Sequence, residues 1–238
     1  MKFFAFCFKL KKKDYNKYRI SKILKEIPMA RVSEQFLEAY APLSMKELKD
    51  PIVFVVDMIE GFVHTGALHD EAIHEVTPNI ENLIRDAQQR VIFIADSHPP
   101  KTREFISYPS HCVTGTIESE VIQELKPHVQ ELMRKNSTNT FTCPDFQSFL
   151  KERLDDYRDI VITGCCTDIC ILQFALCLNA WLNEHNKVEQ RILVPLNCVD
   201  TYHIDGIHDA ISCNEFSIRN MEANGIRIVS ELEREDSL

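Results

Sequence analysis

The sequence predicts an α/β protein of three layers, in which a doubly wound, mainly parallel sheet lies between helices on both faces. Two observations predict this fold. Continuous runs of β-branched and aromatic residues, such as 51–58 and 91–97, are typical of strands buried on both faces. Segments with helical spacing of apolar residues, such as 71–90, lie between those runs. Strict alternation of the two patterns favours a parallel sheet.

The remaining elements follow the same alternation. We expect helices over 118–125, 143–157, 168–186 and 205–225, and strands over 132–137, 159–166, 191–199 and 226–229. The helix after residue 168 is apolar almost all round, which is typical of a core helix or a subunit interface. In open parallel sheets, ligands bind at the carboxyl ends of the strands, near the point where the strand order reverses. The residues at those strand ends are therefore the candidates for a functional site.

Length and composition favour a single domain over 29–238, preceded by a basic extension over 1–28. The chain has 238 residues, of which 45% are hydrophobic, and a net charge of −9, which argues against a nucleic-acid partner. Residues 1–28 carry nine Lys and Arg residues against two acidic residues, and we expect them to be dispensable. No apolar run approaches the roughly 20 residues that span a membrane. We also expect a homo-oligomer.

The chain contains nine cysteines, an odd number that does not fit a secreted disulfide framework. A reducing, cytoplasmic setting fits better. Three of them lie in "TGCCTDIC", residues 163–170. They could be metal ligands, a disulfide, buried residues without a chemical role, or a nucleophile with its neighbours. Paired Cys-x-x-Cys motifs of a zinc cluster are absent, and a disulfide between neighbouring cysteines would be strained. Cys170 falls in the first turn of a helix, where the positive end of the dipole favours a thiolate and lowers the pKa of the thiol, so we interpret Cys170 as a nucleophile.

Chemically active side chains also follow the first three strands. Asp57 follows the first strand, either as a helix cap or turn residue or as a general base. Lys135 ends the short third strand, where an isolated lysine is usually a solvated surface residue. The second strand and its loop supply four metal-ligand types: Asp96, His98, Glu104 and His111. Asp96 and His98 alternate, so their side chains leave an extended chain on one face, and we predict a divalent-metal site rather than scattered loop residues.

Residues 49–229 resemble the isochorismatase-like cysteine hydrolases, and among them the nicotinamidases most closely. The resemblance rests on "VVDMIEGFV", on Lys135, on "TGCCTDIC" and on the order Asp, Lys, Cys at three strand ends. It implies a catalytic triad of Asp57, Lys135 and Cys170, acting on a small-molecule amide. It also implies that one divalent ion, most often zinc but in some members iron or manganese, binds the pyridine nitrogen of nicotinamide.

By the same resemblance the reaction passes through a thioester on Cys170 and releases nicotinate and ammonia. The backbone N–H groups of Cys166 and Cys170 form the oxyanion hole, and a cis peptide bond is implied between Cys166 and Thr167. Phe62 and Phe141 are candidates to pack against the substrate ring. Two alternatives stay open: a related cysteine hydrolase with another substrate, such as an isochorismatase or a metal-free amidase, and a non-catalytic homologue.

Overall fold

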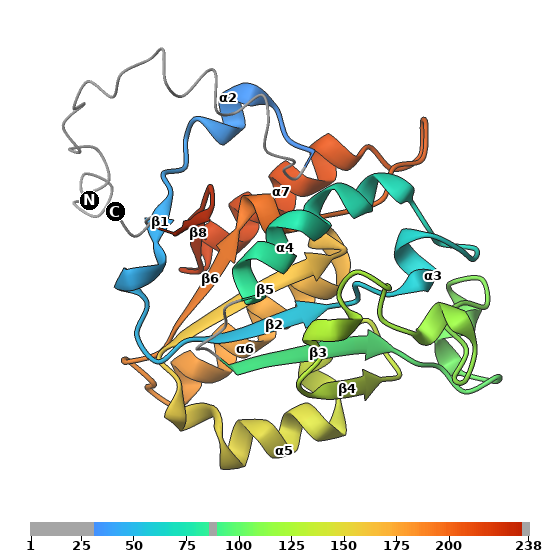
Figure 1. Ribbon diagram of the computed structural model, residues 1–238, viewed down its shortest axis with the longest axis horizontal. Helices are drawn as coiled ribbons and strands as arrows, with labels where there is room; N and C mark the ends of the chain where they lie inside the picture. Colours follow the sequence, from blue (N-terminus) through green and yellow to red (C-terminus); the bar gives the residue numbers. More distant parts are fainter. Residues whose placement is uncertain (1–30, 86–89, 235–238) are drawn as a thin grey trace, which may run out of the picture.

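The computed structural model describes residues 31–85 and 90–234 (Figure 1). The predicted basic extension over 1–28 lies outside the described residues. In the described part, one large sheet carries helices on both faces. No helix of that part is both long and apolar enough to cross a membrane.

The large sheet is entirely parallel, and its strand order is β4-β3-β2-β5-β6-β8, with β7 beside β5. Its strands are β2 (Ile52–Val56), β3 (Arg90–Asp96), β4 (Leu132–Lys135), β5 (Asp159–Cys165), β6 (Arg191–Pro195), β7 (Val199–Asp200) and β8 (Arg227–Val229). The chain passes from β2 outward to β3 and β4, and then returns to the other side of β2 as β5. The strand order therefore reverses between β2 and β5, where such sheets bind ligands.

Helices cover the two faces of the sheet, which confirms the predicted three-layer fold (Figure 1). The main helices are α4 (Thr77–Ile84), α5 (Pro144–Glu152), α6 (Leu172–Glu184) and α7 (Ala210–Ala223). On one face, Phe54 packs edge-on against Phe149 of α5 and Phe174 of α6, and α7 joins the same core. On the other face, α4 packs against the side chains that alternate with these along β2.

Three shorter pieces complete the described chain. They are helix α2 (Glu34–Leu37), helix α3 (Glu60–Val63), and a two-stranded parallel sheet of β1 (Leu43–Ser44) with β9 (Leu232–Glu233). Helix α3 follows β2 and carries the chain over the site end of the sheet. Its position brings Phe62 to the cavity described below.

Several predicted helices are shorter than expected. The helix predicted over 118–125 is wrong: only the turn Ile117–Ser119 is 3-10 helical, and Val121 then bridges to Ile59. The segment 71–76 is a 3-10 helix before α4 begins. Helix α7 begins at Ala210 rather than at 205, because the Asp209 side chain accepts the backbone N–H of Ser212 and caps the helix there.

Gly164 sets how closely β2 and β5 approach at the site. Its φ is +108°, and a Cβ atom at this position would lie 1.9 Å from the carbonyl oxygen of Val56. Only glycine fits such a contact without moving backbone. The residues that follow these two strands are thus brought together by a position without a side chain.

Candidate active site

Asp57 is a fully buried carboxylate directly after β2. It is not a helix cap, because α3 is capped at Ile59. Its backbone is left-handed, with φ of +54°, and its Oδ1 accepts the N–H of Asp96 at 2.9 Å. Its Oδ2 lies 2.8 Å from the Nζ of Lys135. The residue is therefore oriented from both sides, by the neighbouring strand and by a cation.

Lys135 ends β4 and is 1% exposed, so it is not a solvated surface lysine. Its ammonium contacts Asp57 and Asp96, and it lies 3.9 Å from the Sγ of Cys170. Ligand atoms of Asp57, Asp96 and Cys170 lie within 4.8 Å of one another. The structure therefore brings together Asp57, Lys135 and Cys170, although Asp57 and Cys170 are more than a hundred residues apart in the sequence.

The charges in this cluster depend on each other because all of its members are buried. Burial, with the nearby charge of Asp96, raises the pKa of Asp57 to about 7, although Lys135 opposes the shift. Burial opposes the charged form of Lys135, yet Asp57 and Asp96 outweigh it and raise its pKa. Burial also raises the pKa of Cys170 well above its ordinary value, despite Lys135. The expectation of a lowered thiol pKa is thus wrong, because Lys135 does not offset burial together with the negative charges of Asp57 and Asp96.

The turn from β5 to α6 begins one residue earlier than predicted. The cis peptide bond joins Cys165 and Cys166, not Cys166 and Thr167. The reason is local: Cys165 still belongs to β5, where its thiol donates to the Asp57 carbonyl at 3.1 Å, and Cys166 is already the N-cap of the next helical segment. That segment, Thr167–Ile171, is a π-helical turn, and it carries Cys170.

Asp168 does not cap the helical turn to which it belongs. No side chain caps this turn. The Asp168 carboxylate instead accepts the hydroxyl of Thr201 and lies 2.8 Å from the Nε2 of His208. The turn Thr167–Ile171, which we call the nucleophile turn after the role predicted for Cys170, is therefore linked to the segment that follows β7.

The four predicted metal-ligand residues converge next to this cluster. The Nε2 of His98 lies 3.6 Å from Asp96 Oδ2 and 3.8 Å from Glu104 Oε1. The Nε2 of His111 lies 4.0 Å and 3.9 Å from the same two oxygens. The Nδ1 of His98 hydrogen-bonds with the side-chain oxygen of Asn136, and the Nδ1 of His111 hydrogen-bonds with the carbonyl of Pro109.

These donors fit a divalent cation. The Nε2 of His98 and the Oε1 of Glu104 are buried and have no hydrogen-bond partner among the described residues. Nitrogen and oxygen ligands of a tetrahedral zinc ion lie about 3.3 Å apart, so a small inward movement would complete the shell. Outer contacts of the kind made by Asn136 are those that orient metal-bound imidazoles. Asp96 belongs to both groups, because its other oxygen contacts Lys135.

A cavity of about 250 Å³ opens onto both groups. Its lining includes Asp96, Cys166 and Cys170, together with Phe62. Phe62 is 5.8 Å from the His111 ring, centroid to centroid. Phe141 is not among the lining residues: it packs toward Phe146 in the core, so the structure does not place it against a substrate ring.

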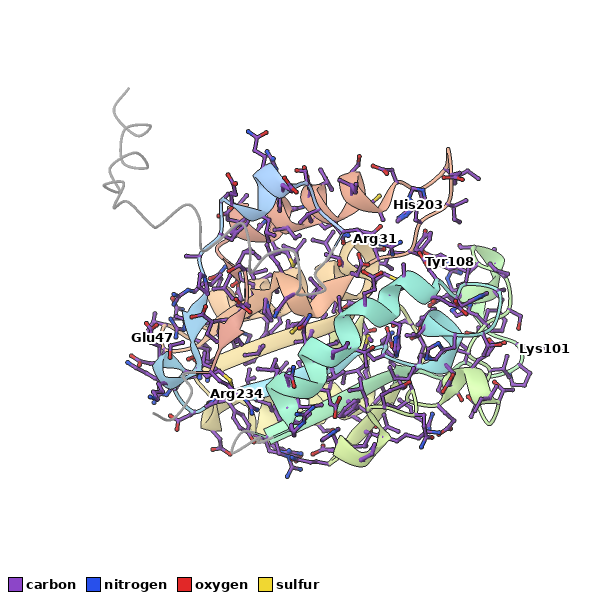
Figure 2. All side chains as sticks on the ribbon, turned by 45° about the horizontal axis from the view of Figure 1, so that its top comes forward. Arg31, Glu47, Lys101, Tyr108, His203 and Arg234 are labelled. Carbon is purple, nitrogen blue, oxygen red and sulfur yellow. The ribbon has the colours of Figure 1, made fainter. Side chains whose placement is uncertain are left out.

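Sequence reasoning missed the outer wall of the cavity. Tyr108, Tyr202 and His203 line it, and Figure 2 labels two of them, Tyr108 and His203, on loops at the same end of the molecule. Tyr202 and His203 follow β7 after one intervening residue, Thr201, so the rule that strand ends carry function applies to them as well. The signal was hidden because β7 is only two residues long and reads as a continuation of β6.

Comparisons with known proteins find a sequence relative and solved structures with the same fold. Nicotinamidase 1 of Arabidopsis thaliana is 31% identical over an alignment of 153 residues that covers 56% of this chain and 62% of the relative. The match thus spans less than two thirds of the length of that relative. Two solved structures share the fold at 22% identity: N-carbamoylsarcosine amidase from Thermoplasma acidophilum (TM-score 0.58, 80% of this chain and 99% of the other) and a pyrazinamidase of Pyrococcus horikoshii in complex with zinc (TM-score 0.58, 76% and 99%).

The family model of the isochorismatase domain matches residues 51–229, from the first residues of β2 to the end of β8. The matched region contains every residue of the buried triad, of the metal-ligand group and of the nucleophile turn. The chain belongs to the isochorismatase family of hydrolases.

Proposed function

We propose that the protein is an amidohydrolase that cleaves nicotinamide to nicotinate and ammonia. The observation that supports the proposal most strongly is that Asp96 belongs both to the triad cluster and to the metal-ligand group. One of its oxygens contacts Lys135 of the triad, and the other faces His98 and His111 of the metal-ligand group. A small ring held at one group therefore presents its substituent to the other. The 31% identical relative, a nicotinamidase, supports the same substrate.

In the proposed reaction, Asp57 takes the proton of the Cys170 thiol as the sulfur attacks the carboxamide carbon. The raised pKa of Cys170 means that the resting thiol keeps its proton, so the transfer accompanies attack rather than preceding it. Lys135, 3.9 Å from the sulfur, stabilises the negative charge as it develops. We assign the oxyanion to the N–H groups of Cys166 and Cys170.

Asp57 then returns the proton to the leaving nitrogen, and ammonia departs. A water molecule that gives a proton to Asp57 then attacks the thioester carbon; the C–S bond breaks to release nicotinate, and Asp57 returns the proton to the sulfur of Cys170. Asp96, His98, Glu104 and His111 would hold a divalent ion, for which zinc is the best fit with iron or manganese as alternatives, and the ion would supply a Lewis-acid partner for the pyridine nitrogen. Phe62 packs against the ring from the wall of the cavity.

The proposal is tested by ammonia release from nicotinamide by the purified full chain, with N-carbamoylsarcosine and benzamide as parallel substrates. Benzamide has the same ring size and carboxamide but no ring nitrogen. We expect turnover of nicotinamide and at least tenfold lower kcat/KM for benzamide. Turnover of N-carbamoylsarcosine in preference to both would replace this function by the related amidase reaction.

A further inference from the structure

A second cluster of metal-ligand types lies outside the active site and shares no residue with it. His64 is the C-cap of helix α3, His74 lies in the 3-10 helix Glu71–Val76, and Glu124 comes from the segment that precedes β4. One ligand atom from each lies within 4.8 Å of the other two. Three separate pieces of chain therefore converge here.

The geometry of the cluster fits a cation better than a hydrogen bond. The Nε2 of His74 is buried and has no hydrogen-bond partner within 31–85 and 90–234. It lies 3.4 Å from Glu124 Oε1, close to the roughly 3.3 Å that separates two ligands of a tetrahedral zinc ion. The rings of His64 and His74 are 5.1 Å apart, centroid to centroid, and are inclined at 48° rather than stacked.

We propose that His64, His74 and Glu124 bind a second divalent cation, with zinc as the ion that fits best. The two imidazoles favour zinc over magnesium or calcium, and zinc also accepts a carboxylate oxygen as a ligand. The side chains of His74 and Glu124 are 39% and 43% exposed, so a water molecule completes the shell. This site does not depend on the proposed amidase reaction.

The position of this second cation site suggests that it stabilises a loop of the active-site cavity. His64 and His74 are the two ends of a loop whose residues Ala67, Leu68 and His69 line the active-site cavity. The loop turns back at Gly66, whose φ is +99° and where a Cβ would meet the Glu118 carboxylate. A cation bound by both His64 and His74 would link the two ends of this loop, and its third ligand, Glu124, would link the loop to another segment of the chain. Closing a loop in this way removes conformational freedom from its open states, so the second ion holds one wall of the cavity.

The first test counts zinc. Full-length protein is stripped with a chelator, dialysed against micromolar zinc and analysed by elemental mass spectrometry. We expect two zinc ions per chain for the wild type, one for His74→Gln, one for His111→Ala in the active site, and none for the double variant. His185→Gln, a histidine stacked on Trp181 away from both groups, is the matched control. If the active-site group does not bind zinc, the wild type binds one ion and His74→Gln none, so the two assignments fail separately.

The second test reads the loop itself by hydrogen exchange over residues 64–74. With zinc at about 100 times its Kd, states that release the ion become about a hundredfold rarer, and exchange slows accordingly. We expect this slowing in the wild type and in His111→Ala but not in His74→Gln or His64→Gln, each of which should melt like the wild type in chelator. Equal zinc content and equal exchange in the wild type and both glutamine variants would overturn the proposal.

Discussion

The carboxylate of Asp168 lies 2.8 Å from the Nε2 of His208, and this contact ties the nucleophile turn to the wall of the cavity. Asp168 is two residues before Cys170, and His208 lies with its ring stacked on Tyr202 at 3.8 Å. The Nδ1 of His208 faces the Tyr202 carbonyl at 2.9 Å. A single imidazole thus positions both a backbone turn and a ring that lines the cavity.

We therefore expect His208→Ala to lower kcat about tenfold, because misplacement of the turn by a fraction of an ångström is costly in catalysis. His208→Gln, which can still donate to Asp168, should recover part of that loss. Steady-state kinetics on nicotinamide would show this, with the rate of Cys170 alkylation as a second readout. Unchanged kcat in the alanine variant would mean that His208 serves only the fold.

Cys170→Ala should remove turnover by a factor on the order of 10³ or more, because the covalent intermediate can no longer form. The matched control is Cys198→Ala, which also removes a buried thiol but lies outside the cavity. Ammonia release and a mass-spectrometric search for the acyl-enzyme provide the measurements. Residual activity near the wild-type level in Cys170→Ala would end its assignment as nucleophile.

Activity should rise with pH through about 7. The pKa of Asp57 is raised to about 7, and only its deprotonated form can take the thiol proton. Below that pH the base is protonated and kcat/KM falls; above it the base is available. The expected acid limb of the kcat/KM profile therefore has an apparent pKa near 7, and a limb near 4, the ordinary value of an aspartate, would show that the pKa of Asp57 is not raised in the working enzyme.

Loss of the proposed active-site ion should impair substrate binding. His111→Ala removes one of the four proposed ligands, and we expect a rise of at least tenfold in KM for nicotinamide, with a smaller effect on benzamide, which has no ring nitrogen. The ratio of the two effects separates a lost ligand from general damage. Equal effects on both substrates would argue against coordination of the pyridine nitrogen.

A shortened chain that starts at Met29 should keep the melting temperature and turnover of the full chain. The basic segment before it has no periodicity that joins the alternating core. Arg31, just after it, is by contrast anchored to Asp70 at 2.9 Å and Asp200 at 2.8 Å. Arg31→Ala is therefore the contrasting variant. Its melting temperature should be lower than that of the full chain, whereas the melting temperature of the shortened chain should be unchanged.

The sequence predicts the sheet, its main helices and the meeting of the triad, because buried parallel strands have a strong apolar signal and their carboxyl ends share one edge. It predicts less well what short-range hydrogen bonds decide. Asp168 could have capped a helix, but its carboxylate reaches Thr201 and His208, which are distant in the chain. Phe141 follows a strand end yet turns into the core, and no local pattern distinguishes the two directions.

Gly164 has a consequence for how this enzyme tolerates mutation. The position carries no chemistry, yet any side chain there meets the Val56 carbonyl at 1.9 Å and must separate β2 from β5. Asp57 follows one strand and the nucleophile turn follows the other, so a single added methyl group would lengthen the path of the proton between them. A saturation scan scored by turnover should therefore show Gly164 to be as intolerant as Cys170, and Gly164→Ala should lose activity while its zinc content remains that of the wild type.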